Sequence, residues 1–188
     1  MVKHGRILIA LLVAPWAFGS SWTVCVTDTA AVLTPPVRGA VTREFRSLMG
    51  SQGAGLAFDK CSTGKPRMHL LIEDEPPNGL EGVLGLARRK HGRIEPQLQV
   101  FYGSLMRYLG EPNSAEALGR AVARVAAHEA AHFLTQQPHH CKRGLLQANL
   151  SAYELLAADS PQFRSHPRCD PDTSGRQAPD TVADPASR

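Results

Sequence analysis

The chain has 188 residues, a formal net charge of +4, 43% hydrophobic residues and 20% charged residues. This length suits one ordinary domain with a hydrophobic core plus end segments, and the composition is typical of a globular protein rather than a disordered or membrane-embedded one. The positive charge is mild and the arginines are scattered apart from the run Arg88–Lys90, which argues against a nucleic-acid partner.

The N-terminal segment has the order of a secretory signal. Basic residues precede the apolar run Ile7–Ala14, and small residues follow up to Gly19. Pro15 breaks the run, which is short for a bilayer span. We therefore expect a signal peptide at residues 1–19, a secreted or periplasmic mature protein, and no stable membrane association after cleavage. An uncleaved anchor is the alternative.

Hydrophobic spacing and turn residues predict a series of strands and helices after the signal. In chain order these are a strand at Trp22–Ala30, a helix from Pro35 to a stop at Gly50, strands at Leu56–Asp59 and Met68–Glu73, a turn at Pro76–Gly79, a strand at Gly82–Arg88, a bend at Gly92–Pro96, a strand at Leu98–Gly103 and a short helix at Ser104–Leu109. This order predicts an α+β fold in which helices pack on a mixed sheet. The domain spans residues 20–169, and the Pro- and Asp-rich residues 170–188 are expected to be a disordered tail.

A long Ala-rich helix is predicted over residues 114–134, opened by a capping box of Asn113 and Glu116. Its buried stripe is predicted at Leu118, Ala121, Val122 and Val125. Extending that stripe by three and four residues reaches His128, Glu129 and His132. These three side chains are therefore expected to face the protein interior.

The residues His128-Glu129-Ala-Ala-His132 form an HExxH motif. Two histidines four residues apart lie on one helix face and can bind the same zinc ion, while the glutamate beside them can deprotonate a metal-bound water. Two merely hydrogen-bonded histidines are the alternative, but a chance match of the whole motif has odds of about one in a hundred. A third ligand is expected after Pro138 breaks the helix, from His139 or His140.

Other residues compete for roles at this site. Glu154 is a rival third ligand of the thermolysin-like kind, but Ser151 and Glu154 also form a capping box for the helix at Tyr153–Asp159, which uses the carboxylate locally. Tyr153 is expected to pack, with oxyanion stabilisation as its alternative role. Cys141 beside the histidines is disfavoured as a ligand because no CxxC spacing accompanies it.

The stretch HEAAH-FLTQQPH-H-CKR-GLL resembles metzincin-type zinc metallopeptidases, and more narrowly small exported bacterial proteins with the pattern HExxH-x7-H-x3-G-hydrophobic-Met. The likeness covers most of Trp22–His166, although only the core motif is specific. It implies His140 as the third zinc ligand, and Leu146 as the equivalent of the Met-turn methionine. It also implies a small, mostly parallel twisted sheet with two main helices, the second carrying HExxH, then a Met-turn-like loop and a C-terminal helix.

The function implied is that of a secreted, monomeric zinc endopeptidase, which hydrolyses peptide or protein substrates with a zinc-bound water activated by Glu129. One alternative is a catalytically silent secreted zinc-binding module that interacts with other proteins. The other is a disulfide-held binding protein without metal, for which the motif would be a coincidence.

Four cysteines in an exported chain predict two disulfides. Cys25 lies in the first predicted strand and Cys61 just after the second, which parallel pairing would bring close. Cys141 and Cys169 flank the segment that follows the third histidine. We predict the pairs Cys25–Cys61 and Cys141–Cys169.

Overall fold

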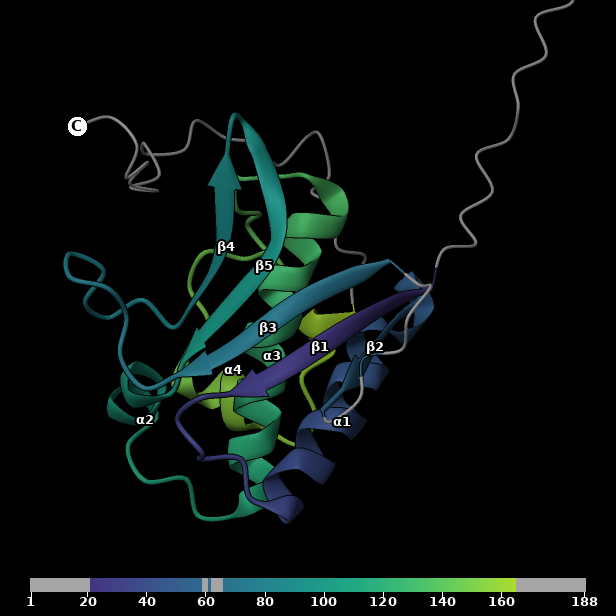
Figure 1. Ribbon diagram of the computed structural model, residues 1–188. Coiled ribbons are helices and arrows are strands. Elements are labelled where there is room, and N and C mark those ends of the chain that lie inside the picture. Colours follow the sequence, from purple (N-terminus) through teal and green to yellow (C-terminus); the bar gives the residue numbers. More distant parts are fainter. Residues whose placement is uncertain (1–20, 59–60, 62–65, 165–188) are drawn as a thin grey trace, which may run out of the picture.

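The structure is a computed structural model that describes residues 21–58, 61 and 66–164. At its centre is a five-stranded sheet with the order β2-β1-β3-β5-β4 (Figure 1). The strands are β1 (Trp22–Asp28), β2 (Ala54–Ala57), β3 (Arg67–Glu73), β4 (Gly85–Lys90) and β5 (Arg93–Phe101). Three neighbouring pairs are parallel, and β4 runs antiparallel to β5. The predicted α+β class and mixed, mostly parallel sheet are confirmed.

Several predicted boundaries in the sheet are wrong. The first strand ends at Asp28 instead of Ala30, and the strand predicted at Gly82–Arg88 is β4 at Gly85–Lys90. The strand predicted at Leu56–Asp59 begins two residues earlier, as β2. The bend predicted at Gly92–Pro96 is largely the start of β5, because the chain already reverses at His91 and Gly92, which have φ of 50° and 77°. Pro96 is tolerated within β5 because it has no partner in register on β3 or β4, so its missing N–H removes no ladder bond.

Two long helices, α1 (Pro35–Met49) and α3 (Ala115–Thr135), lie behind the sheet in Figure 1. Val37, Val41 and Phe45, the predicted apolar positions of α1, are buried in the core that this helix forms with α3 and the sheet. Gly119 of α3 lies against the main chain of α1, and a Cβ at that position would be 2.5 Å from the Cβ of Ala40. The two helices therefore approach backbone to backbone at this crossing.

The beginning of α3 differs from the prediction by one residue. Ser114, not Asn113, is the N-cap, and its hydroxyl accepts a hydrogen bond from the N–H of Ala117 at 3.1 Å. Glu116 then falls one position too early for a capping box and instead forms an ion pair with Arg43 of α1. Serine and asparagine are comparable N-caps, so the sequence alone did not favour one of them.

The predicted stripe of α3 is only part of its buried surface. Leu118 is half-buried, and every residue from Ala121 to His132 is buried. One of these is Arg124, which donates to the Glu44 carboxylate of α1 at 2.7 Å and to the carbonyl of Glu154. The helix is thus covered by the sheet, by α1 and by the segment that follows the metal-binding region.

The C-terminal part of the described chain contains α4 (Ala152–Leu156) and a 3-10 turn at Pro161–Arg164, while α2 (Tyr102–Leu109) precedes α3. The capping box of Ser151 and Glu154 is confirmed, although the helix is shorter than predicted. Tyr153 is 78% exposed, so the expectation that it packs is wrong. It lies on the outer side of this one-and-a-half-turn helix, whose buried contact is made by Leu155.

The disulfide Cys25–Cys61 is present, with Cα atoms 5.7 Å apart. Parallel pairing of β1 with β2 brings it about, since Cys25 is in register with Ala57 and Cys61 follows shortly after. Cys141 is also disulfide-bonded. Its predicted partner Cys169 lies outside the described residues.

The predicted signal peptide at 1–19 and tail at 170–188 also lie outside the described residues. Within the described ranges, no helix combines the length and hydropathy needed to cross a membrane.

The close approach of α1 and α3 predicts that Gly119→Ala lowers the free energy of unfolding by roughly 1–3 kcal/mol, although alanine is the better helix former, because the added methyl group overlaps the main chain of α1. Gly39→Ala in α1 is the matched control. The added Cβ would meet only the end of the Arg43 side chain, at 3.4 Å. The free energy of unfolding of this variant should therefore rise by about 0.5–1 kcal/mol. Urea unfolding of both variants tests this, and equal effects at the two positions would contradict it.

Candidate metal centre

The metal centre begins with His128 and His132, one turn apart on α3 and 7% and 6% exposed. Their Nε2 atoms are 3.0 Å apart. The Nδ1 of His128 lies 2.7 Å from the carbonyl oxygen of Leu145, and the Nδ1 of His132 lies 2.6 Å from that of Gln137. A carbonyl oxygen only accepts hydrogen bonds, so each Nδ1 carries the proton and each Nε2 presents a lone pair.

Two lone pairs that face each other at this distance repel unless a cation lies between them. Two imidazoles on one tetrahedral zinc ion, at about 2.0–2.1 Å each, have their nitrogens roughly 3.3 Å apart. The observed 3.0 Å between His128 and His132 is close to that value. Carbonyl acceptors for the second ring nitrogen are also the usual arrangement for metal-binding histidines. The pair therefore fits zinc.

His140 completes the group. Its ring centroid lies 5.2 Å from that of His128 and 5.0 Å from that of His132, and the ligand atoms of the three residues lie within 4.8 Å of one another. Among the described residues, this is the group of histidine, cysteine or acidic side chains that could hold a metal ion. Of the two neighbours that the sequence offered, the structure brings His140 to the site and leaves His139 outside the group.

The chain reaches this position by a turn at the end of α3. Gln136 is the C-cap and has φ of 54°, in the left-handed region usually taken by glycine. Its side-chain amide compensates by bonding to both main-chain groups of Ile94 at 3.1 Å, and so fixes the helix end to the start of β5. Gln137 then offers its carbonyl to His132, directly before Pro138. The break predicted at this proline is thus built around one of the candidate metal-binding histidines.

A second turn lies beneath the site. Gly144 has φ of 87°, its carbonyl accepts from the N–H of Gln147 at 3.1 Å, and the N–H of Cys141 donates to the carbonyl of Leu146 at 2.7 Å. Leu146 is buried, at 1% exposure, and the neighbouring carbonyl of Leu145 is the one that holds His128. Gly144 therefore makes a tight turn, and this turn supports the ring of His128.

Burial controls the charge of His128. The pKa of His128 is lowered to about 3, mainly by burial and further by His132 and His140. The imidazole is therefore neutral in the fold, which is the form that binds metal.

Glu129, the residue after His128, is also buried, at 7% exposure. Burial raises the pKa of its carboxyl to about 8, and a backbone hydrogen bond from Ala87 acts in the opposite direction. Gly85 also lies close to the carboxylate, since a Cβ on this residue would be 2.9 Å from Glu129 Oε1 and 2.6 Å from Val125. Strand β4 therefore crosses directly over the carboxylate. Sequence reasoning missed both β4 residues, and the only available signal was a glycine at a strand start.

The rival ligands have other partners. The Glu154 carboxylate accepts from the main chain of Ser151 at 2.8 Å, in the capping box, and is not part of the three-histidine group. Cys141 is disulfide-bonded.

No family model and no curated protein matches this sequence. Among solved structures, the chain is similar to the crystal structure of archaemetzincin from Methanopyrus kandleri, with a TM-score of 0.50 and 16% sequence identity. The match covers 85% of this chain and 94% of that chain, so nearly the whole of the archaeal protein has a counterpart here. At this identity the likeness concerns the fold.

The geometry predicts that His140→Ala lowers zinc affinity by orders of magnitude, because it removes one of three ligands, while His139→Ala stays near the wild-type value. Zinc titration of both variants against a competing chelator measures the difference. The opposite ranking would place the third ligand one residue earlier, and loss of zinc on Glu154→Ala instead would favour the thermolysin-like site.

The metal-free protein should show an unusual pH dependence that originates at Glu129. Its carboxyl has a pKa of about 8 when folded and near 4.5 when unfolded, so the folded state holds an extra proton between these values and stability falls as the pH rises through that range. Glu129→Gln removes this contribution.

Urea unfolding of the two metal-free proteins measures this effect. Between pH 5 and pH 8, the free energy of unfolding of Glu129→Gln should rise relative to that of the wild type by on the order of a few kcal/mol. His128 contributes with the opposite sign between pH 6.5 and about 3, but it is present in both proteins. A difference that does not change with pH would show that Glu129 is not buried in this way.

Proposed function

We propose that the protein is a secreted zinc-dependent peptidase in which His128, His132 and His140 bind zinc and Glu129 is the general base. The observation that carries this proposal is the convergence of three imidazoles beside a buried carboxylate. The fold shared with archaemetzincin and the metzincin-like spacing of the motif support the same function.

The chemistry needs a base and a place for the proton. Zinc, when bound, supplies a Lewis acid that makes water nucleophilic near neutral pH. Glu129 takes the proton of the attacking water as its oxygen adds to the substrate carbonyl carbon. When the C–N bond breaks, the same carboxyl returns the proton to the leaving nitrogen. A divalent cation held by the neighbouring histidines would favour the ionised form of the Glu129 carboxyl, which is the form that acts as a base.

The edge strand β4 offers a place for the substrate main chain. Among the strands of the described chain, β4 has a neighbour on one side, β5. Phe101 donates to the carbonyl of Leu84, so alternate residues turn their main chain towards β5, and the intervening Gly85 and Ala87 turn theirs to the other side. The N–H of Ala87 is used by Glu129, which leaves the carbonyl of Ala87 and the main chain of Gly85 on this edge. An extended peptide can add to such an edge through main-chain hydrogen bonds. Here it would pass beside Glu129.

The proposal includes export. The disulfide Cys25–Cys61 agrees with an oxidising compartment, as does the signal peptide predicted for residues 1–19. Leu146 is proposed as the equivalent of the Met-turn methionine, since it is fully buried in the turn that supports His128. We further propose that the mature protein acts as a monomer on peptides or proteins, with no nucleic-acid partner and no stable membrane association.

A peptide-cleavage assay with and without a chelator tests this function. Glu129→Ala should keep its zinc and lose activity by several orders of magnitude, because the base is gone. Glu154→Gln is the control, since glutamine preserves the capping box, and it should remain active. If zinc-loaded wild-type protein cleaved no peptide, the protein would be a silent zinc-binding module. If folded protein took up no zinc, both the peptidase and the zinc-binding module would be excluded.

A further inference from the structure

The β4–β5 hairpin carries an unbalanced set of cations. Arg88, Arg89, Lys90 and Arg93 are all exposed, and the one acidic residue between Gly85 and Phe101 is the half-buried Glu95. Ion pairs elsewhere in the described chain hold three other arginines, those at positions 43, 107 and 124. The four hairpin cations form no ion pair with any described residue. Their charge is therefore available to a partner.

This hairpin begins at the candidate active site. Ala87 bonds to the carboxylate of Glu129, and the first cation is the next residue along β4. The hairpin is fixed near its tip to the end of α3 by the two hydrogen bonds between Ile94 and Gln136. In Figure 1 the hairpin extends past the other strands alongside this end of the helix. A chain that adds to the edge of β4 beside Glu129 would therefore continue along the cations.

The two faces of the hairpin differ. Arg89 is in register with Ile94, which is buried and bonded to the end of α3, so Arg89 lies on the face of the sheet that carries the metal centre. Arg88 instead lines a hollow of about 290 Å³ on the other face, with His69 and Gln99. Arg89 is thus the cation best placed to meet a substrate side chain.

We propose that this hairpin selects substrates with aspartate or glutamate on the N-terminal side of the cleaved bond, with Arg89 as the main determinant; this rests on the proposed peptidase function. Antiparallel pairing is the more stable way to add a strand. A substrate antiparallel to β4 has its N-terminal residues beside the C-terminal end of β4, where Arg88–Lys90 lie. Lys142 and Arg143, exposed directly after His140, add positive charge near the same centre.

A peptide fits these cations better than a nucleic acid does. The segment from Gly85 to Arg93 has no Phe, Tyr or Trp on which a base could stack, and its one aromatic ring is the imidazole of His91. Arg88, Arg89 and Lys90 also lie on β4, the strand that crosses Glu129, so a peptide paired with this strand would run alongside them.

The first test uses zinc-loaded mature protein and a mixture of peptides. Mass spectrometry of the products should show aspartate or glutamate enriched on the N-terminal side of the cleaved bonds. For one such peptide and its Glu→Gln counterpart, kcat/KM should favour the acidic form about two- to fivefold per charge, the range for exposed ion pairs. The preference should appear in KM and weaken as salt is raised.

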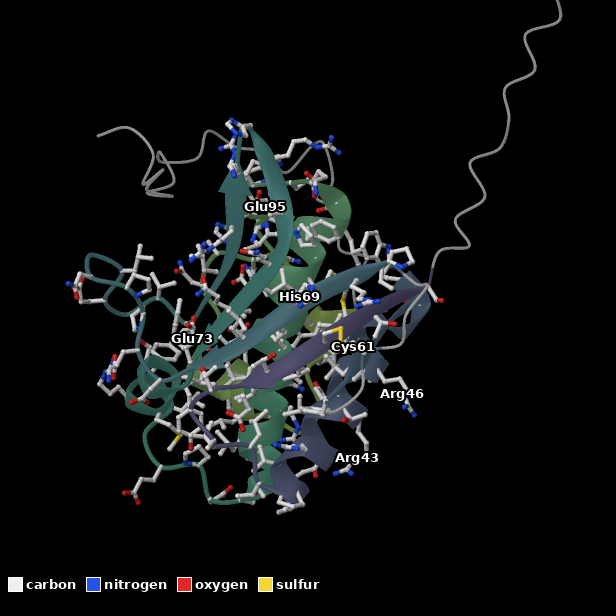
Figure 2. All side chains as sticks on the ribbon, viewed as in Figure 1. Arg43, Arg46, Cys61, His69, Glu73 and Glu95 are labelled. Carbon is white, nitrogen blue, oxygen red and sulfur yellow. A yellow bond between two sulfur atoms is a disulfide. The ribbon has the colours of Figure 1, made fainter. Side chains whose placement is uncertain are left out.

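The matched variants are Arg89→Glu and Arg46→Glu, which change the net charge equally. Arg46 is exposed on α1, and Figure 2 shows it well separated from Glu95 of the hairpin. Arg89→Glu should abolish or invert the preference, whereas Arg46→Glu should keep it. Equal loss in both variants, no acidic preference, or a preference on the C-terminal side would overturn the proposal.

A binding measurement separates the two hypotheses. Fluorescence anisotropy with the zinc-loaded Glu129→Gln variant compares the acidic and neutral peptides without turnover. If the wild type cleaved nothing, the peptidase function would fail, whereas equal binding of the two peptides would refute the role of the hairpin. Tighter binding of a single-stranded oligonucleotide, lost on a further Arg89→Glu change, would assign the cations to nucleic acid instead.

Discussion

The Nε2 lone pairs of His128 and His132 face each other because the Nδ1 atom of each ring donates a hydrogen bond on the opposite side. Each ring is oriented by a carbonyl oxygen, and both carbonyls belong to the segment after α3. That segment must leave the helix at once and return beneath it, which requires left-handed residues at Gln136 and Gly144. The orientation of His128 and His132, the position of His140 and the turn around Leu146 are therefore linked by main-chain hydrogen bonds of one segment.

A second constraint is the burial of α3 on all sides from Ala121 to His132. Polar side chains in such a helix lose their hydration and need partners from other elements. Arg124 finds them on α1 and in the segment around α4, and Glu129 finds Ala87 on β4. Glycines mark two places where main chain approaches closely: Gly119 of α3 lies against α1, and Gly85 of β4 lies against Val125 and Glu129 of α3. The same packing that gives stability holds the carboxylate at the edge of the sheet.

The fold shared with archaemetzincin does not by itself define what the protein acts on, because one fold supports many sites. Differences between such proteins are expected in loops and edges rather than in the central helix. In this chain the polar groups under the sheet are buried and the pKa of His128 keeps its ring neutral, while the rim next to them carries exposed cations. Selection of a substrate by charge would thus occur outside the proposed catalytic site.

The sequence by itself determined the elements whose signals are local. Helical spacing predicted α1 and α3, parallel pairing of two predicted strands was enough to predict Cys25–Cys61, and the i, i+4 spacing put His128 and His132 on one inward face. The HExxH motif is readable because a helix converts a fixed spacing into a fixed direction.

Contacts between distant segments were decided only by the tertiary structure. Pro138 predicted a break, but local geometry left His139 and His140 equal; family spacing favoured the second, and the fold brings that one to the others. The N-cap shifted to Ser114 because two good capping residues stand side by side. Gly85, Ala87 and Arg89 gained their positions from the antiparallel pairing of β4 with β5, which begins almost thirty residues before α3 and has no pattern that points to Glu129. Such placements depend on how whole elements pack, and no short stretch of residues encodes that.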